Sequence, residues 1–197
     1  MRKSVSALVR RPDFSRDAFH AYYEGRHAPL GAAHFPFARY VRNHLLDAPD
    51  IGFDTLSEFW AKDFDAMMAI NEGPVGAIFR EGELRFMDKP RNAPAWAEES
   101  VLSATTQSET RSLHLLRWTG VGDLPRAGLL AHLQALAGEC SGLSVDFIAA
   151  WGANGFPADA LVWADGDARL PPPPGAFDIV RVAVRRCETP PGSLLGA

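Results

Sequence analysis

The sequence predicts an α+β protein built from two tandem halves that pair as one barrel. Over residues 1–106, strand-like and helix-like runs alternate in the order β-α-β-β-α-β, which is the ferredoxin-like arrangement. Over residues 111–197 a weaker copy follows, in which four consecutive prolines stand where the second helix would be. A sheet with both helices on one face needs a cover for its other face. We therefore expect the halves to cover each other and to enclose a cavity between them.

The first half has clear boundary signals. Ser15 is a suitable N-cap and Asp17 follows in the first turn, where a negative charge suits the helix dipole. Pro29 disfavours a helical conformation at Ala28 and is expected to end this first helix. The other expected elements are strands at 4–9, 39–46, 55–60 and 98–104, a helix at 62–71, a helical turn at 75–79 and a loop at 87–96.

The second half is shorter. Residues 107–110 are the expected linker, and the stretch 165–175 is too short and too rich in proline for a full helix. The expected elements are strands at 112–119, 143–151, 160–164 and 177–185 and a leucine-rich helix at 125–138.

Composition excludes several classes of function. The chain has 197 residues, 47% of them hydrophobic, and a net charge of −4, so no basic surface for nucleic acid is expected. No window approaches the roughly 20 apolar residues of a membrane span, and no apolar signal segment is present at the N-terminus. Cys140 and Cys187 form no metal-binding or redox motif. We expect a cytoplasmic protein with free thiols, no metal and no cofactor.

The candidate site begins at the end of the first helix. An apolar stripe at helical spacing includes Tyr23 and ends at His27. In the next strand Tyr40, Arg42 and His44 alternate onto one face. In the strand after it Glu58 and Trp60 share a face. If both polar sets point toward the cavity, then Tyr40, His44, Glu58 and Trp60 surround one space, and His27 can reach its rim.

A histidine, a tyrosine and a carboxylate in a partly apolar cavity suit acid–base chemistry on a small molecule, without a metal or nucleotide. The same residues also permit a structural interpretation. His27 can interact with the last carbonyls of its helix, while Tyr40 and Trp60 can be ordinary packing residues. Glu58 can face solvent or pair with Arg42, because a buried carboxylate needs a partner.

Five motifs over roughly the first 105 residues make the N-terminal half similar to the EthD family of the dimeric α+β barrel superfamily. They are the sequences RPDFS at 11–15, FHAYYEGRHAPL at 19–30, RYVRNH at 39–44 and SEFW at 57–60, followed by RFMD at 85–88. The resemblance implies a ferredoxin-like half. Members of the family are usually homodimers, so a fused pair implies either a monomer with an internal pseudo-dimer or a homodimer.

The resemblance also implies chemistry. Better-understood relatives are an isomerase of muconolactone and fungal decarboxylases or dehydratases of polyketides, which move protons without a cofactor. His27 and Tyr40 match the family's histidine and strand tyrosine, so we expect His27, Tyr40, His44 and Glu58 to be catalytic. Tyr23, Arg42 and Trp60 are expected to bind a small hydrophobic, cyclic or aromatic metabolite.

Two alternatives remain open. The chain can be a non-catalytic ligand-binding or auxiliary protein that supports an oxygenase in ether or xenobiotic degradation. It can also bind haem, as some members of the superfamily do. The muconolactone isomerase uses a cysteine as well, and both cysteines of this chain lie outside the matched half.

Overall fold

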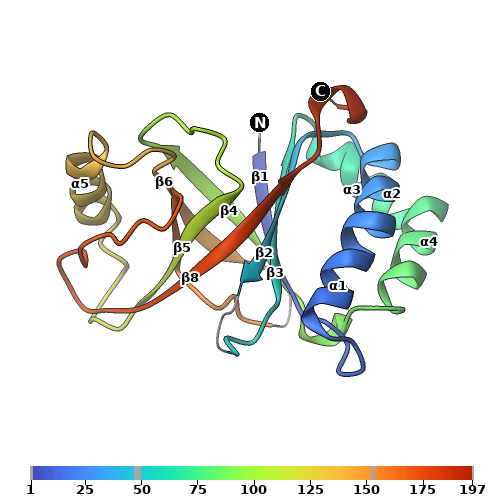
Figure 1. Ribbon diagram of the computed structural model, residues 1–197, viewed down its shortest axis with the longest axis horizontal. Coiled ribbons are helices and arrows are strands. Elements are labelled where there is room, and N and C mark those ends of the chain that lie inside the picture. The colour runs from blue at the N-terminus through green and yellow to red at the C-terminus, as the bar shows by residue number, and fades with distance from the viewer. Residues whose placement is uncertain (1, 47–49, 152–153, 197) are drawn as a thin grey trace.

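A computed structural model describes residues 2–46, 50–151 and 154–196 (Figure 1). The strands described there close into one barrel in the order β1-β3-β2-β8-β5-β7-β6-β4, and every neighbouring pair is antiparallel. The strands are β1 (Arg2–Leu8), β2 (Phe37–Leu46), β3 (Thr55–Ala61), β4 (Ala93–Val101), β5 (Thr110–Trp118), β6 (Ser144–Ala150), β7 (Ala160–Asp165) and β8 (Phe177–Glu188). The helices are α1 (Arg16–Tyr22), a π-helix (Tyr23–His27), α2 (Ala28–His34), α3 (Phe64–Glu72), α4 (Pro74–Glu83) and α5 (Arg126–Leu136), with 3₁₀ turns at Lys89–Arg91 and Pro191–Ser193.

The predicted fold class is confirmed. Strands β1 to β4 form one half and β5 to β8 the other, and the barrel closes where β2 pairs with β8 and β4 pairs with β6. Helices α1 to α4 cover the outer side of the first half, whereas α5 alone covers the second half on the opposite side of the barrel (Figure 1). Residues 166–176 contain no helix, so the second half is trimmed as predicted. None of the helices in the described ranges is long and apolar enough to cross a membrane.

Two expected boundaries are wrong. Pro29 does not end the first helix: the chain continues through a π-helix into α2, and Pro29 falls in the first turn of α2. A proline is tolerated there because its missing N–H would not be used in the first helical turn. The last strand of the first half begins at Ala93 within the expected loop, although Pro94 and small residues gave no strand signal.

The barrel interior is a packed core. Val5, Leu56, Leu113, Leu161 and Trp163 from both halves are almost completely buried there in a single apolar cluster. The two sheets therefore cover each other's helix-free faces, as the sequence predicts. The functional cavity, however, was expected inside this barrel. The cavity that His27 lines lies elsewhere, on the outer, helix-covered side of the first sheet.

Candidate functional site

The helical segment over the first sheet carries the histidine. Ser15 caps α1, since its hydroxyl accepts a hydrogen bond of 3.2 Å from the N–H of Ala18. In the π-helix the N–H of Ala28 donates to the carbonyl of Tyr23, five residues earlier. A π-turn inserts one residue into the helix and is often found at functional sites. Both Tyr23 and His27 are buried under this turn, against the sheet.

A cavity of about 210 Å³ lies between the helices and the outer face of the first sheet. Most of its wall is aromatic or apolar, and the polar side chains that reach it include Tyr23, His27 and Tyr40. The apolar wall includes side chains of β2, β3, α3 and α4 and of the segments that follow α2 and α4: Phe35, Phe37, Phe59, Phe64, Met67, Phe79 and Met87. A concave, mostly apolar cavity with a few polar groups is the usual form of a small-molecule site.

His27 is 6% exposed and stacks among aromatic rings. Its ring centre lies 4.3 Å from that of Phe79, 5.1 Å from that of Tyr23 and 5.2 Å from that of Phe86. Within the described part of the chain, neither ring nitrogen makes a hydrogen bond. Burial, helped by the nearby charge of Lys89, lowers the pKa of His27 to about 3. The imidazole is therefore neutral at pH 7 and has an unused donor and an unused acceptor.

Two tyrosines form a hydroxyl chain beside it. The hydroxyl of Tyr23 lies 2.8 Å from that of Tyr40 and 2.9 Å from that of Ser57. Burial raises the pKa of Tyr23 to about 12 and places the pKa of Tyr40 well above its ordinary value. Both phenols are neutral at pH 7 and can donate hydrogen bonds. Sequence reasoning missed Ser57, whose signal was its place on the strand next to that of Tyr40.

The expectation that Tyr40, His44, Glu58 and Trp60 surround one space is wrong. In the register of β2 and β3, Tyr40 lies opposite Phe59 and His44 opposite Thr55, whereas Val41 lies opposite Glu58. Opposite residues share a face of the sheet, so Tyr40 and His44 point to the helices while Glu58 and Trp60 point into the barrel.

Inside the barrel Glu58 belongs to a charged network that joins the halves. Lys3 Nζ lies 2.7 Å from Glu58 and from Asp146 on β6, and Arg111 on β5 donates to Glu58 at 2.9 Å. Although burial acts in the other direction, Lys3 and Arg111 lower the pKa of Glu58 to about 2. Trp60 lies against the same lysine, whose Nζ is 4.6 Å from the indole centre. Glu58 and Trp60 therefore lie on the barrel side of the sheet and do not line the cavity of His27.

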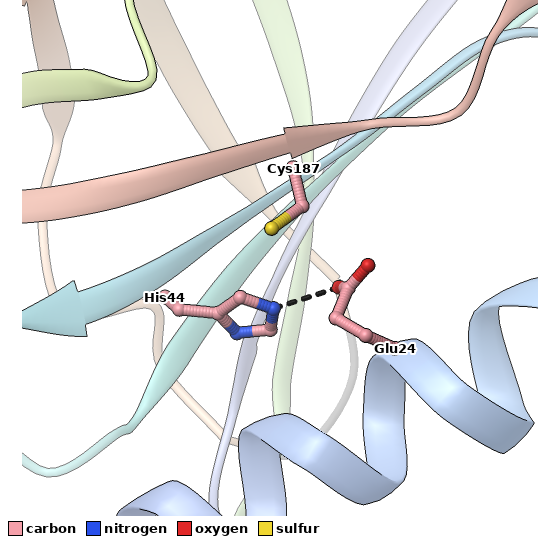
Figure 2. A group of neighbouring side chains, drawn as sticks. All are labelled: Glu24, His44 and Cys187. Atoms are coloured by element: carbon pink, nitrogen blue, oxygen red, sulfur yellow. Dashed lines mark hydrogen bonds and ion pairs between the residues drawn. The ribbon is translucent and has the colours of Figure 1, made fainter.

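His44 and Arg42 meet Glu24, which sequence reasoning missed. His44 Nε2 lies 2.7 Å from Glu24 Oε1 (Figure 2). Arg42 donates to both oxygens of that carboxylate, at 3.0 and 2.6 Å. Burial raises the pKa of Glu24, but the bonds from His44 and Arg42 outweigh it and bring the value to about 2. A glutamate within a helix usually faces solvent, so its position gave no signal. The only indication of Glu24 in the sequence was that Arg42, once buried, requires a charged partner.

Cys187 on β8 completes this group, because ligand atoms of Glu24, His44 and Cys187 lie within 4.8 Å of one another (Figure 2). Such a donor set suits zinc in principle. Here, however, Arg42 bonds both carboxylate oxygens, and His44 uses its second nitrogen to bond Thr55 at 2.8 Å. Burial also raises the pKa of the Cys187 thiol, which disfavours the thiolate that a metal needs. The bonds from Glu24 to His44 and Arg42 join the π-helix to β2.

Comparison with known families decides the relationship of the first half. Residues 11–90 match the family described as the EthD domain. This stretch is an EthD domain. The resemblance inferred from the motifs is thus confirmed for the N-terminal half. The solved structure of an EthD family protein from Bacillus halodurans is 20% identical and aligns over 45% of this chain and 90% of its own, with a TM-score of 0.37.

Two other solved structures match almost the whole chain. A candidate monooxygenase from Lactobacillus acidophilus is 10% identical, covers 94% of this chain and 93% of its own, and has a TM-score of 0.53. An anthrone oxidase-like protein is also 10% identical, covers 95% and 93%, and has a TM-score of 0.51. At this identity the likeness concerns the fold alone. No curated protein matches the sequence.

Proposed function

We propose that the chain is a cofactor-independent enzyme that moves a proton within a small, largely apolar ring compound bound in the cavity of its EthD domain. The observation that carries this proposal is the state of His27. A buried, neutral imidazole with both nitrogens free of described partners lines an aromatic cavity. No hydrogen bond is described for either nitrogen, and neither is among the fully buried side-chain atoms that lack a partner in the described residues, so both are open to a ligand in the cavity.

The chemistry follows from the groups that reach the cavity. His27 accepts a proton from an acidic carbon or hydroxyl of the ligand, and the electron pair left behind moves onto the ligand's oxygen. The phenol pair of Tyr23 and Tyr40 donates a hydrogen bond to that oxygen and stabilises its charge in a site of low polarity. His27 then returns the proton to another atom of the same molecule, which is an isomerisation. Return to a leaving hydroxyl gives water and a dehydration instead.

The roles of the other expected site residues change accordingly. His44 and Arg42 hold Glu24, which lies within the π-helix, so we propose them as positioning residues for Tyr23 and His27. Glu58 and Trp60 lie on the other face of the sheet, and we assign them no part in the reaction.

The cavity limits the substrate. Engineered apolar cavities of about 150 Å³ admit one benzene ring. A cavity of about 210 Å³ therefore suits one or two fused rings. Polar side chains are the minority of its lining, namely Ser4, Ser6, Tyr23, His27, Tyr40, Asn71 and Glu83. We therefore propose a ligand with one carbonyl or hydroxyl group and an otherwise apolar surface.

Proton abstraction can be measured without the natural substrate. The two-ring ketone 2-tetralone has acidic C–H bonds, and its exchange in deuterated water is followed by NMR. The full chain is expected to accelerate this exchange, and His27→Gln to reduce the acceleration at least 100-fold. Arg26→Gln, one residue earlier and exposed, is the matched control and should retain it. Equal rates in the wild type and His27→Gln would remove His27 from the mechanism.

One observation favours the alternative of a binding protein without catalysis. A pKa of about 3 makes His27 a weak base. The same samples distinguish the two functions: a ligand-binding protein would bind 2-tetralone without accelerating its exchange. Oxygen uptake in the same assay tests the oxygenation that the names of the two full-length structural neighbours suggest. An absorption spectrum of the purified protein tests haem.

A further inference from the structure

The second half contains a cavity of its own, of about 300 Å³. It lies between α5 and the outer face of the second sheet, under the proline-rich segment that replaces the missing helix. By topology this is the counterpart of the cavity of His27, because β5 and α5 occupy in the second half the places of β1 and α1. Its apolar wall includes Leu116, Leu129, Leu133, Val162 and Ile179, and the segment 170–173 also lines it.

The polar groups of this second cavity come from different elements than in the first. His114 on β5 lies opposite Arg181 on β8, and both face the cavity. The carbonyl of Ala168 lies 3.4 Å from His114 Nε2, so this nitrogen carries the proton and Nδ1 is left as an acceptor. His114 is 5% exposed, and Nδ1 bonds to no residue in the described ranges.

The charged side chains that line this cavity are arginines. Arg181 pairs with Asp167 outside the cavity and donates to the carbonyl of Ala168 at 3.0 Å. Arg169 lines the cavity and is exposed, and it makes no ion pair or hydrogen bond to another described residue. No acidic side chain is among the described residues that line this space. The free guanidinium of Arg169 at an apolar cavity is complementary to an anion with an apolar body, and carboxylates are preferred partners of arginine.

We propose that this second cavity binds an apolar monocarboxylate, with the carboxylate at Arg169 and the ring or chain against α5. The segment 169–173 then covers the ligand from outside. The inference is independent of the chemistry proposed for His27, because it concerns the other half of the chain and a different set of residues.

The test is calorimetric titration of the full chain with 2-naphthoate at low ionic strength, where charge pairing is least screened. We expect binding of 2-naphthoate and at least tenfold weaker binding of its neutral analogue, 2-naphthamide. Arg169→Gln should weaken naphthoate binding at least tenfold and leave naphthamide unaffected. Since Arg169 is exposed and unpaired, this variant should fold. Arg126→Gln, on α5 but outside the cavity, is the matched control and should bind like the wild type.

Because 2-naphthoate also fits the size of the first cavity, its position must be established. In NMR spectra of the imidazole groups, binding should shift the signals of His114 and leave those of His27 unchanged. Shifts at His27 alone, equal affinity of Arg169→Gln and the wild type, or equal affinity for naphthoate and naphthamide would each overturn the proposal. A Leu133→Trp variant, which fills the apolar end, should abolish binding, and unchanged binding would also contradict it.

Discussion

The hydroxyl groups of Tyr23 and Tyr40 lie 2.8 Å apart and join the π-helix to β2 at the wall of the cavity. Tyr23 also bonds Ser57, so it is the central member of a chain of three buried hydroxyls. This chain fixes the position of the turn that carries His27. It also leaves a phenol available to the cavity, because each hydroxyl has one proton to donate and two lone pairs.

The hydroxyl chain predicts unequal costs for two similar substitutions. Tyr23→Phe leaves both Tyr40 and Ser57 without their partner, and we expect a loss of about 2 kcal/mol in the free energy of unfolding. Tyr40→Phe leaves Tyr23 bonded to Ser57, and the expected loss is about 1 kcal/mol. Urea unfolding measures both. Tyr22→Phe, on the same helical segment, is the control and should stay within about 0.5 kcal/mol of the wild type. The reverse order of the two main variants would contradict the assigned bonds.

Burial of His27 predicts a specific acid sensitivity. The folded protein keeps His27 neutral down to about pH 3, whereas the unfolded chain protonates it near pH 6.5. Between these values the unfolded state binds the additional proton, so stability falls as the pH is lowered, by about 1.4 kcal/mol per pH unit. Urea unfolding at pH 7, 6 and 5 should therefore show a flatter decline for His27→Gln than for the wild type. His34→Gln, at an exposed position, should leave the decline as it is, and parallel curves for all three proteins would refute the burial of His27.

The charged network in the barrel predicts a large effect far from the cavity. Lys3 is 2% exposed and contacts both Glu58 and Asp146. Lys3→Met leaves these carboxylates buried without their cation, and we expect a loss of about 3–5 kcal/mol in the free energy of unfolding. Arg85→Gln breaks the exposed pair with Glu81 and should cost less than about 1 kcal/mol. A Lys3→Met loss as small as that of Arg85→Gln would mean that the network does not hold the halves together.

The closure of the barrel predicts how the proposed domains, 1–106 and 111–197, behave when they are separated. Each half alone would expose the sheet face that the other now covers, together with the unpaired edges of β2 and β4. We expect the fragment 1–106 to dimerise or aggregate, whereas the full chain folds as one unit. Light scattering of the purified fragment checks this. A monodisperse monomeric fragment would contradict the expectation that the helix-free face of this sheet must be covered.

Local patterns predicted the elements but not their register. Alternation correctly placed Tyr40 and His44 on one face of β2, because the period of a strand is two. It could not tell which face of β3 adjoins that face, since this depends on register, and β2 has an irregularity between Phe37 and Arg39. The polar side of β3, which carries Glu58, was consequently assigned to the wrong space.

The site itself was only partly accessible from sequence for a related reason. The helical spacing and the EthD motifs identified His27, Tyr23 and Tyr40, which the structure brings to one cavity. The π-turn that lets the helix pass Pro29 has no simple sequence signal, and it brings Glu24 to His44. Partners supplied from distant strands, such as Cys187, depend on the closure of the barrel and cannot be inferred from spacing.

The most direct test of the account is the imidazole ¹⁵N spectrum of His27 at pH 7, recorded without and with saturating 2-naphthol, a two-ring phenol. In the empty cavity we predict a neutral ring, as its burial requires. With the phenol bound, the His27 signals should move toward those of a hydrogen-bonded or protonated ring, while the signals of His114 stay unchanged. A His27 ring already protonated in the free protein, or one whose signals do not move when the phenol is bound, would contradict the assignment of this cavity as the functional site.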